Sequence, residues 1–298
     1  MNITIIGSGG QIGSRLLTSL APLGAITALD RPQLDLADLD AIESCLCETT
    51  PDIIVNAAAY TDVDGAEEDQ TTAHLINAQA PGRMAAAAKA CGALLVHYST
   101  DYVFDGTSSI PYRPEDAPNP LSVYGQTKRD SELAVLAADP EHRHSLILRT
   151  SWIYDHVGRN FLLTMQRLAQ EHQTLKVVDD QYGAPTFSKT IADATAQILA
   201  QSVSGDQGNR HLDRRGGLYH LTSTGETTWF GFATAIIDHG PTQPSIEPVG
   251  TDAFPRPAHR PRNSRLDLTK TTETFELDLP SWQEALAACL DEQSDELQ

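Results

Sequence analysis

The sequence predicts an α/β protein with a doubly wound parallel sheet and a smaller C-terminal lobe. Over the first 150 residues, short apolar and β-branched runs alternate with helical segments. Such βαβ alternation is typical of a parallel sheet that is covered by helices on both faces. After residue 150 the alternation weakens, and residues 241–261 are rich in proline with little periodicity. Loops of a substrate-binding lobe have this character.

The individual elements follow from runs of similar residues in chain order. The first predicted strand is Asn2–Ile6, and a glycine turn leads from it into a helix that ends near Leu20. Further strands are predicted at 25–29, 52–58, 94–99 and 145–149, and further helices at 39–47, 78–91 and 122–136. We therefore expect a sheet domain at 1–150, with part of 183–222 returning to it, and a mainly substrate-binding lobe at 151–298.

Composition restricts the possible partners and location. The formal net charge of −19 opposes binding to DNA or RNA, and the basic stretch from Arg256 to Arg265 suits a small anion better than a duplex. No run of about 18 apolar residues predicts a membrane span. Because residues 1–13 already form a predicted strand and turn, we expect no secretory signal and a cytoplasmic protein. We expect a monomer or weak homodimer.

The glycine turn after the first strand predicts a dinucleotide site. Gly7, Gly10 and Gly13 allow a tight turn, a close backbone approach to pyrophosphate and close packing of helix on sheet. Gln11 and Ile12 lie between them at the helix N-terminus, which favours phosphate charge. The G-x-x-G-x-x-G spacing differs by one residue from the usual fingerprint, and it is familiar in short-chain reductases. A Rossmann-like domain that binds NADPH or NADH is therefore expected.

Residues at the ends of the next strands are predicted to contact the same cofactor. Asp30, after the second strand, can accept hydrogen bonds from the adenosine ribose and thus favours NADH, whereas Arg31 could meet a 2′-phosphate of NADPH. Asp35 and Leu36 are expected to border the adenine. The end of the third strand should run beside the cofactor with Ala58, Ala59, Tyr60 and Thr61.

A catalytic group is predicted around Tyr124 and Lys128. The two side chains lie one helical turn apart, and an ammonium is expected to lower the phenol's pKa from about 10 so that it can transfer a proton. The lysine can also hold the nicotinamide ribose. Thr100, at the end of the preceding strand, supplies a hydroxyl that orients a substrate carbonyl. Together these three residues form the triad of short-chain dehydrogenases.

At this point the sequence resembles the dTDP-4-dehydrorhamnose reductases of the extended short-chain dehydrogenase/reductase superfamily. The matching stretches keep the family's order and spacing across nearly the whole chain, and they are 99–106, 124–128, 149–154, 160–161, 180–186 and 260–266. The resemblance implies NAD(P)H-dependent reduction of the C4 ketone of dTDP-4-dehydro-L-rhamnose, the last step of dTDP-L-rhamnose synthesis. Tyr124 would be the proton donor, and the substrate would meet Thr100, Asp101, Trp152, Asn160, Arg262 and Asn263.

Two alternatives remain open at this stage. An epimerase or dehydratase of the same superfamily would recycle its cofactor, but sugar-nucleotide 4,6-dehydratases typically show Thr-Asp-Glu where this chain has Tyr102 as the third residue. A non-catalytic subunit that resembles the regulatory β subunit of methionine adenosyltransferase would keep a similar Tyr-x-x-x-Lys pair. Residues 150–152 and 180–186 match the reductases better than that subunit.

The sequence predicts no metal in this protein. Some reductases of this family are thought to bridge two subunits through Mg²⁺ held by glutamates, which suits the preference of Mg²⁺ for oxygen ligands. Two of those glutamate positions correspond to Arg15 and Lys189 in this chain. Because cations cannot ligate Mg²⁺ and would repel it, we expect neither activity nor assembly to depend on the metal.

Overall fold

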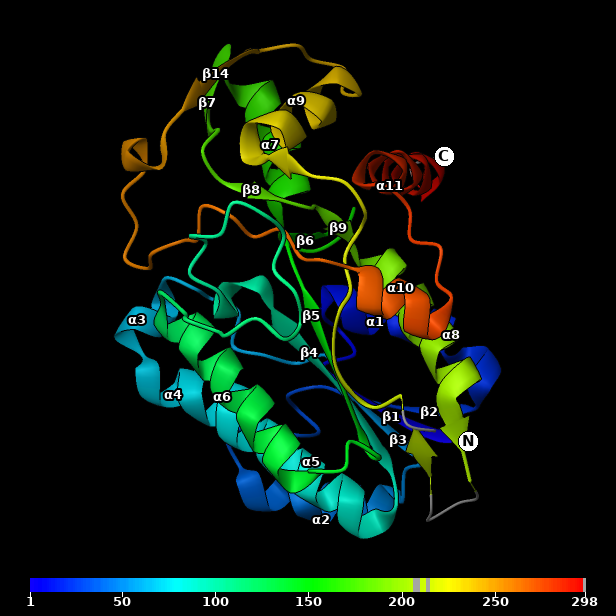
Figure 1. Ribbon diagram of the computed structural model, residues 1–298. Coiled ribbons are helices and arrows are strands. Elements are labelled where there is room, and N and C mark those ends of the chain that lie inside the picture. Colours follow the sequence, from blue (N-terminus) through cyan, green and yellow to red (C-terminus); the bar gives the residue numbers. More distant parts are fainter. Residues whose placement is uncertain (206–209, 213–214, 297–298) are drawn as a thin grey trace.

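One parallel sheet organises the larger part of the molecule (Figure 1). The computed structural model describes residues 1–205, 210–212 and 215–296, and within these ranges six parallel strands follow the order β12-β5-β4-β3-β1-β2. The strands are β1 (Asn2–Ile6), β2 (Ala25–Leu29), β3 (Ile53–Asn56), β4 (Leu94–Thr100), β5 (Ser145–Thr150) and β12 (Gly217–His220). The predicted doubly wound parallel sheet is confirmed.

The strand order creates a crevice at the carboxyl edge of the sheet. From β1 the chain moves to β2 on one side and then crosses to β3 on the other side. In open parallel sheets, ligands bind where the direction of winding reverses in this way. The loops after β1 and β3 therefore flank the expected binding crevice.

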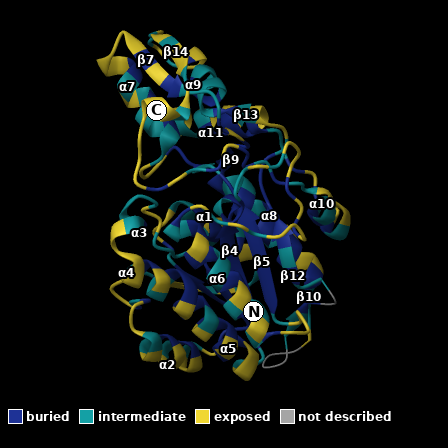
Figure 2. Ribbon diagram, turned by 60° about the vertical axis from the view of Figure 1, so that its left-hand side comes forward, coloured by how far each residue is buried: buried dark blue, intermediate teal, exposed yellow. Residues whose placement is uncertain are grey.

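Helices cover both faces of the sheet. One face carries α1 (Gln11–Ser19) and α8 (Ser188–Ser202), and the other carries α2 (Leu39–Thr49), α5 (Ala80–Cys91) and α6 (Val123–Ala138). Because successive side chains of a strand point to opposite faces, Ile53 and Val55 pack under α1 and α8 whereas Ile54 packs under α2 and α5. Figure 2 shows the central strands β4 and β5 as a buried layer between helices with exposed outer surfaces, whereas the edge strand β2 is mostly exposed or half-buried.

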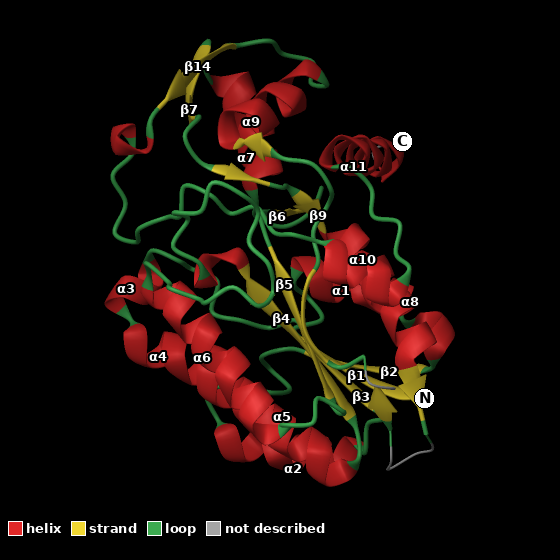
Figure 3. Ribbon diagram, viewed as in Figure 1, coloured by secondary structure: helices red, strands yellow, loops and turns green. Residues whose placement is uncertain are grey.

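A second group of elements lies beyond the carboxyl edge of the sheet (Figure 3). It contains α7 (Phe161–Glu171), α9 (Trp229–Asp238), α11 (Trp282–Glu296) and the parallel pair β7 (Thr174–Val178) and β14 (Ser245–Val249). These elements share their own apolar core, in which Phe232, Tyr154 and Phe187 are fully or almost fully buried. Between the two groups the chain returns to the sheet, since α8 packs on α1 and β12 pairs with β5.

Short elements complete the chain. They are η1 (Ala21–Leu23), α3 (Gly65–Glu68), α4 (Gln70–His74), η2 (Leu75–Gln79), η3 (Asp101–Val103), β6 (Ile153–Tyr154), β8 (Tyr182–Gly183), β9 (Thr186–Phe187), β10 (Val203–Ser204), β11 (His211–Leu212), β13 (Thr227–Thr228), η4 (Thr251–Ala253) and α10 (Thr269–Phe275). Among the described residues, every helix is too short or too polar to span a bilayer.

Candidate active site

The glycine turn between β1 and α1 has the geometry that a dinucleotide requires. Gly7 has a backbone φ of +81°, which residues other than glycine rarely adopt. A Cβ on Gly13 would lie 1.9 Å from the carbonyl oxygen of Gly7, so a larger residue does not fit there. Gly10 is the N-cap residue of α1 and has no side chain with which to cap the helix. The N–H groups of the first turn, which includes Gln11 and Ile12, therefore remain available to an anion.

Asp30 organises this turn. Its carboxylate accepts hydrogen bonds from the hydroxyl of Ser8 at 2.6 Å and from the backbone N–H of Gly9 at 2.9 Å. The neighbouring Arg31 is exposed, and its guanidinium lies 3.6 Å from the carboxylate of Asp35. The acid that was predicted to bind the ribose therefore holds the glycine turn in shape.

The predicted cofactor residues after β3 lie beside the same turn. A Cβ on Gly7 would come within 2.8 Å of Ala58, so the two backbones touch. The backbone of Tyr60 is held from both sides by the buried amide of Asn77 in η2. Ala59 is half-buried and Thr61 is exposed in the same loop. Asp35 lines an open hollow of about 600 Å³, whereas Leu36 is buried in the core.

The predicted catalytic residues converge from two neighbouring elements. Thr100 is the last residue of β4, and Tyr124 and Lys128 lie on one face of α6, which begins after the N-cap Ser122. The side chain of Lys128 is almost fully buried and donates a hydrogen bond to the backbone carbonyl of Tyr98 at 2.6 Å. Because β3 pairs with β1 and β4, these groups share the sheet edge with the glycine turn.

The structure contradicts the expected direction of the pKa of Tyr124. Burial and the negative charge of Asp101 raise this pKa to about 12, although a hydrogen bond with Thr100 acts in the opposite direction. Burial also lowers the pKa of Lys128 to about 8, against the effect of Glu132. The expectation of a lowered pKa neglected the cost of placing a phenolate in the interior. Tyr124 is therefore a fully protonated donor near neutral pH.

Asp101 has an unusual environment for a carboxylate. It is 2% exposed, and burial raises its pKa to about 6, although hydrogen bonds with Ser264 and Thr100 favour the charged form. The hydroxyl of Thr100 donates to Asp101 at 3.0 Å. A charged carboxylate can only accept, so Asp101 in its charged form draws the hydrogen of the Thr100 hydroxyl to its own side.

A pocket of about 820 Å³ lies mainly within the C-terminal lobe, and Asp64 is the residue of the sheet domain that lines it. Its volume suits a nucleotide-sized ligand. Its cationic lining comes from Lys176, Arg256, Arg260 and Arg262. Arg260 is held in a two-point ion pair by Asp64, which also lines the pocket.

Trp152, a predicted substrate residue, belongs to an aromatic stack. Trp152 has a φ of +48°, which is strained for a residue with a side chain. Its indole ring stacks on that of Trp229, with 3.6 Å between the ring centroids and 8° between the ring planes. Trp229 lines the pocket, packs against Phe161 and donates a hydrogen bond to Gln181 at 3.1 Å. Trp229 was not among the predicted site residues, because a tryptophan at the start of a helix is equally typical of a hydrophobic core.

Two predicted substrate residues are already engaged within the protein. The amide of Asn160 caps α7 at Leu163 and also donates to the side chain of Gln11 at 3.0 Å. The amide of Asn263 donates to the backbone carbonyls of Ser108 and Ile110, both at 2.9 Å. Both residues fix loops around the site, and Arg262 lines the pocket directly.

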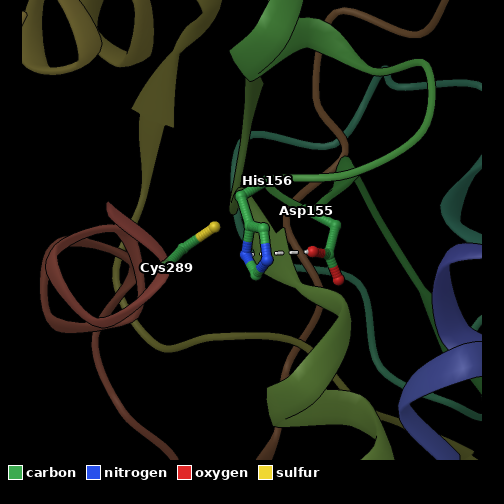
Figure 4. Close-up of side chains that lie close together, drawn as sticks. All are labelled: Asp155, His156 and Cys289. Carbon is green, nitrogen blue, oxygen red and sulfur yellow. Dashed lines mark ion pairs between the residues drawn. The ribbon is translucent and has the colours of Figure 1, made fainter. Parts of the chain in front are cut away.

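A buried polar cluster that was not predicted from the sequence lies where α1 meets the C-terminal lobe. Among the described residues, one group of three possible metal ligands lies close together, Asp155, His156 and Cys289 (Figure 4). The guanidinium of Arg15 already binds both oxygens of Asp155, at 2.8 and 2.7 Å. Burial would raise the pKa of Asp155, but hydrogen bonds from Arg15 and Ser188 outweigh it and lower the pKa. The guanidinium of Arg15 therefore supplies the positive charge that balances Asp155 in this cluster.

Arg15 and Lys189 meet at one acid. The guanidinium of Arg15 lies 2.9 Å from the carboxylate of Glu292 on α11, and the ammonium of Lys189 lies 4.0 Å from it. The two cations that were predicted to stand at glutamate positions of some relatives therefore share a carboxylate partner.

Comparisons with known proteins match nearly the whole chain. The family described as the RmlD substrate binding domain matches residues 1–294. A dTDP-4-dehydrorhamnose reductase of Burkholderia thailandensis is 42% identical over 298 residues, which cover 97% of this chain and 98% of the relative.

Solved structures are similar over the same length. A dTDP-4-dehydrorhamnose reductase of Clostridium acetobutylicum is 34% identical with a TM-score of 0.90, over 99% of this chain and 100% of that chain. The enzyme of Bacillus anthracis, solved in complex with NADP, is 33% identical with a TM-score of 0.89, over 98% and 99%. The resemblance inferred from the motifs is confirmed. This chain belongs to the RmlD substrate binding domain family, together with these dTDP-4-dehydrorhamnose reductases.

Proposed function

We propose that this protein reduces the C4 ketone of dTDP-4-dehydro-L-rhamnose to dTDP-L-rhamnose, with NADPH or NADH as the reductant. The observation that carries the proposal is the convergence of Thr100, Tyr124 and Lys128 at the carboxyl edge of the sheet, which they share with the glycine turn. Family membership over nearly the full chain supports the same activity.

The residues of the crevice fit a dinucleotide. The uncapped N-terminus of α1 after Gly10 offers backbone donors to a pyrophosphate, and a side chain at Gly13 would fill the space that the turn needs. Asp30 and the segment Ala58–Thr61 then border the adenosine side. When bound, a reduced nicotinamide supplies the hydride.

Side chains of the protein supply the proton that the ketone oxygen receives. In this proposal the phenol of Tyr124 donates its hydrogen to the ketone oxygen as C4 accepts the hydride, and the raised pKa keeps that hydrogen in place at neutral pH. The Lys128 ammonium then stabilises the phenolate that forms, until solvent restores the proton. Thr100 orients the ketone oxygen.

The cationic pocket supports a nucleoside diphosphate as the carrier of the sugar. The side chains of Arg256 and Arg262 are 61% and 72% exposed, and each lies 4.0 Å from the nearest carboxylate. They are therefore freer to bind a diphosphate than Arg260, which Asp64 holds. We assign the diphosphate to this pair and the deoxysugar to the side of Trp152 and Asp101.

The decisive experiment incubates purified protein with dTDP-4-dehydrorhamnose and either NADPH or NADH. The near-ultraviolet absorbance of the reduced nicotinamide should disappear, and the product should gain two hydrogens by mass. Conversion of the sugar without net cofactor consumption would indicate an epimerase or dehydratase instead. Absence of any conversion, together with capture by a methionine adenosyltransferase, would indicate a regulatory subunit.

Location and assembly follow from this function. A reductase that consumes NADPH or NADH requires the cofactor pool of the cytoplasm, where we place it. We propose a monomer or weak homodimer, because the chemistry needs groups from one chain only. Size measurement by light scattering tests the assembly.

A further inference from the structure

A buried histidine lies directly behind the catalytic lysine. His97, on β4, is 1% exposed. Its Nδ1 is 3.1 Å from the amide nitrogen of Asn56, and its Nε2 is 3.0 Å from the hydroxyl of Ser131 and 3.4 Å from the ammonium of Lys128. The mechanism proposed above uses Lys128 and assigns nothing to His97.

The neighbours of His97 fix which ring nitrogen carries its hydrogen. The side-chain oxygen of Asn56 accepts the backbone N–H of Ala58 at 3.1 Å, so the amide nitrogen of Asn56 must face the imidazole. An amide nitrogen only donates, and Nδ1 of His97 must therefore accept. The hydrogen of the neutral ring then lies on Nε2.

The hydrogen on Nε2 has a matching acceptor. The hydroxyl of Ser131 donates its own hydrogen to the carbonyl of Lys128 at 2.5 Å, which leaves its lone pairs for the Nε2–H of His97. Nε2 consequently cannot accept from Lys128, although the two nitrogens are neighbours. One hydrogen of the ammonium goes to the carbonyl of Tyr98, and the other two must find acceptors away from His97.

We propose that His97 is a positioning residue. It stays neutral with its hydrogen on Nε2, and it thereby turns two hydrogens of the Lys128 ammonium towards Tyr124 and the cofactor. The inference rests on the proposed function, which gives Lys128 its role. A continuous series of hydrogen bonds then runs from the backbone N–H of Ala58, just after β3, through Asn56, His97 and Ser131 to the backbone carbonyl of Lys128 in α6.

The surrounding charges agree with a neutral ring. Burial and the charge of Lys128 hold the pKa of His97 well below its usual value. Glu132, an acid on the same helix α6 as Lys128, forms an ion pair with Arg149 of β5 at 2.7 Å and accepts a hydrogen bond from the Ser99 hydroxyl. Its charge is therefore not free to stabilise an imidazolium.

The direct test is the protonation of the ring in the wild-type protein. Long-range ¹H–¹⁵N NMR of histidine-labelled protein distinguishes a protonated from an unprotonated ring nitrogen, and the signals lost in a His97→Asn variant identify the residue. We expect a bare Nδ1 and a protonated Nε2 throughout the range of activity. A hydrogen on Nδ1, or a ring that titrates in that range, overturns the proposal whether or not the protein reduces the sugar.

The functional test gives Lys128 an acceptor at the same place. In His97→Gln the side-chain oxygen can accept from the ammonium and draw it inward, so NADPH affinity and kcat should both fall by about 10- to 100-fold, as expected for a displaced catalytic group. The control is His220→Gln on β12, which replaces another fully buried histidine with a lowered pKa, whose ring contacts Arg149 and the backbone carbonyl of Asp267.

The two variants separate positioning from packing. Similar losses of melting temperature in both, with loss of cofactor affinity in His97→Gln alone, support the proposal. Equal cofactor affinity in both variants would reduce His97 to a packing residue. If the wild type binds NADPH but leaves dTDP-4-dehydrorhamnose unchanged, the proposed function fails, and cofactor affinity together with the NMR signals still decides the role of His97.

Discussion

The hydroxyl of Ser8 lies 2.6 Å from the carboxylate of Asp30, so the acid at the end of β2 is bonded to the glycine turn after β1. The same carboxylate accepts the backbone N–H of Gly9. Each oxygen keeps a lone pair for a ribose hydroxyl, and the negative charge repels a 2′-phosphate.

We expect Asp30→Ala to weaken NADH by about tenfold, because a hydrogen bond to a charged acceptor is lost, and to weaken NADPH less. The two dissociation constants, measured by fluorescence titration, test this. Ser8→Ala is the control, since it disturbs the turn but keeps the carboxylate and should affect both cofactors alike. Equal losses for both cofactors in Asp30→Ala would leave the acid with a purely structural role.

Tyr124→Phe should reduce kcat by about 10²- to 10⁴-fold, the usual contribution of a positioned proton donor, and should leave the dissociation constant of NADPH nearly unchanged. The phenyl ring keeps the packing against Tyr102 and removes only the hydroxyl. Steady-state kinetics and cofactor titration measure the two effects. A variant that retains about a third of wild-type kcat contradicts the assignment of Tyr124.

The pH profile should report Lys128. Its charged form predominates below its pKa of about 8, so kcat/KM should be high below this pH and fall as the pH rises through it. Lys128→Arg keeps a charge at all these pH values and should lose this limb, although its overall rate will be lower. Lys128→Ala should impair both turnover and cofactor affinity. An unchanged affinity would exclude contact with the ribose.

Arg15→Ala should destabilise the protein by about 3 kcal/mol, because it leaves the fully buried carboxylate of Asp155 without its cation. Lys189→Ala is the matched control, since its ion pairs are exposed and contribute less than about 1 kcal/mol. Urea denaturation of both variants gives the comparison. Similar midpoints would mean that Asp155 finds another partner.

Activity should survive treatment with EDTA, and the mass in solution should be the same with and without Mg²⁺. Arg15 and Lys189 surround Glu292 with positive charge, which opposes a divalent cation at this carboxylate. An EDTA-treated assay and light scattering test the two statements. A Mg²⁺-dependent dimer would show that these cations do not stand at metal-binding positions.

The sequence alone predicted the parts of the site that depend on short-range spacing. Gly7, Gly10 and Gly13 mark a turn because glycine is required wherever backbone touches backbone. Tyr124 and Lys128 share a helix face because four residues make about one turn. The alternation of strands and helices predicted the parallel sheet, and carboxyl ends of parallel strands necessarily meet at one edge.

Only the tertiary structure decided how these groups behave together. Burial raised the pKa of Tyr124, and the desolvation of a residue is not visible in its local pattern. The Trp152–Trp229 stack and the Asp64–Arg260 ion pair join segments far apart in the chain. Helical and strand periodicity describes contacts over a few residues, whereas these partners and the low dielectric around them are set by which surfaces the folded lobes bring together.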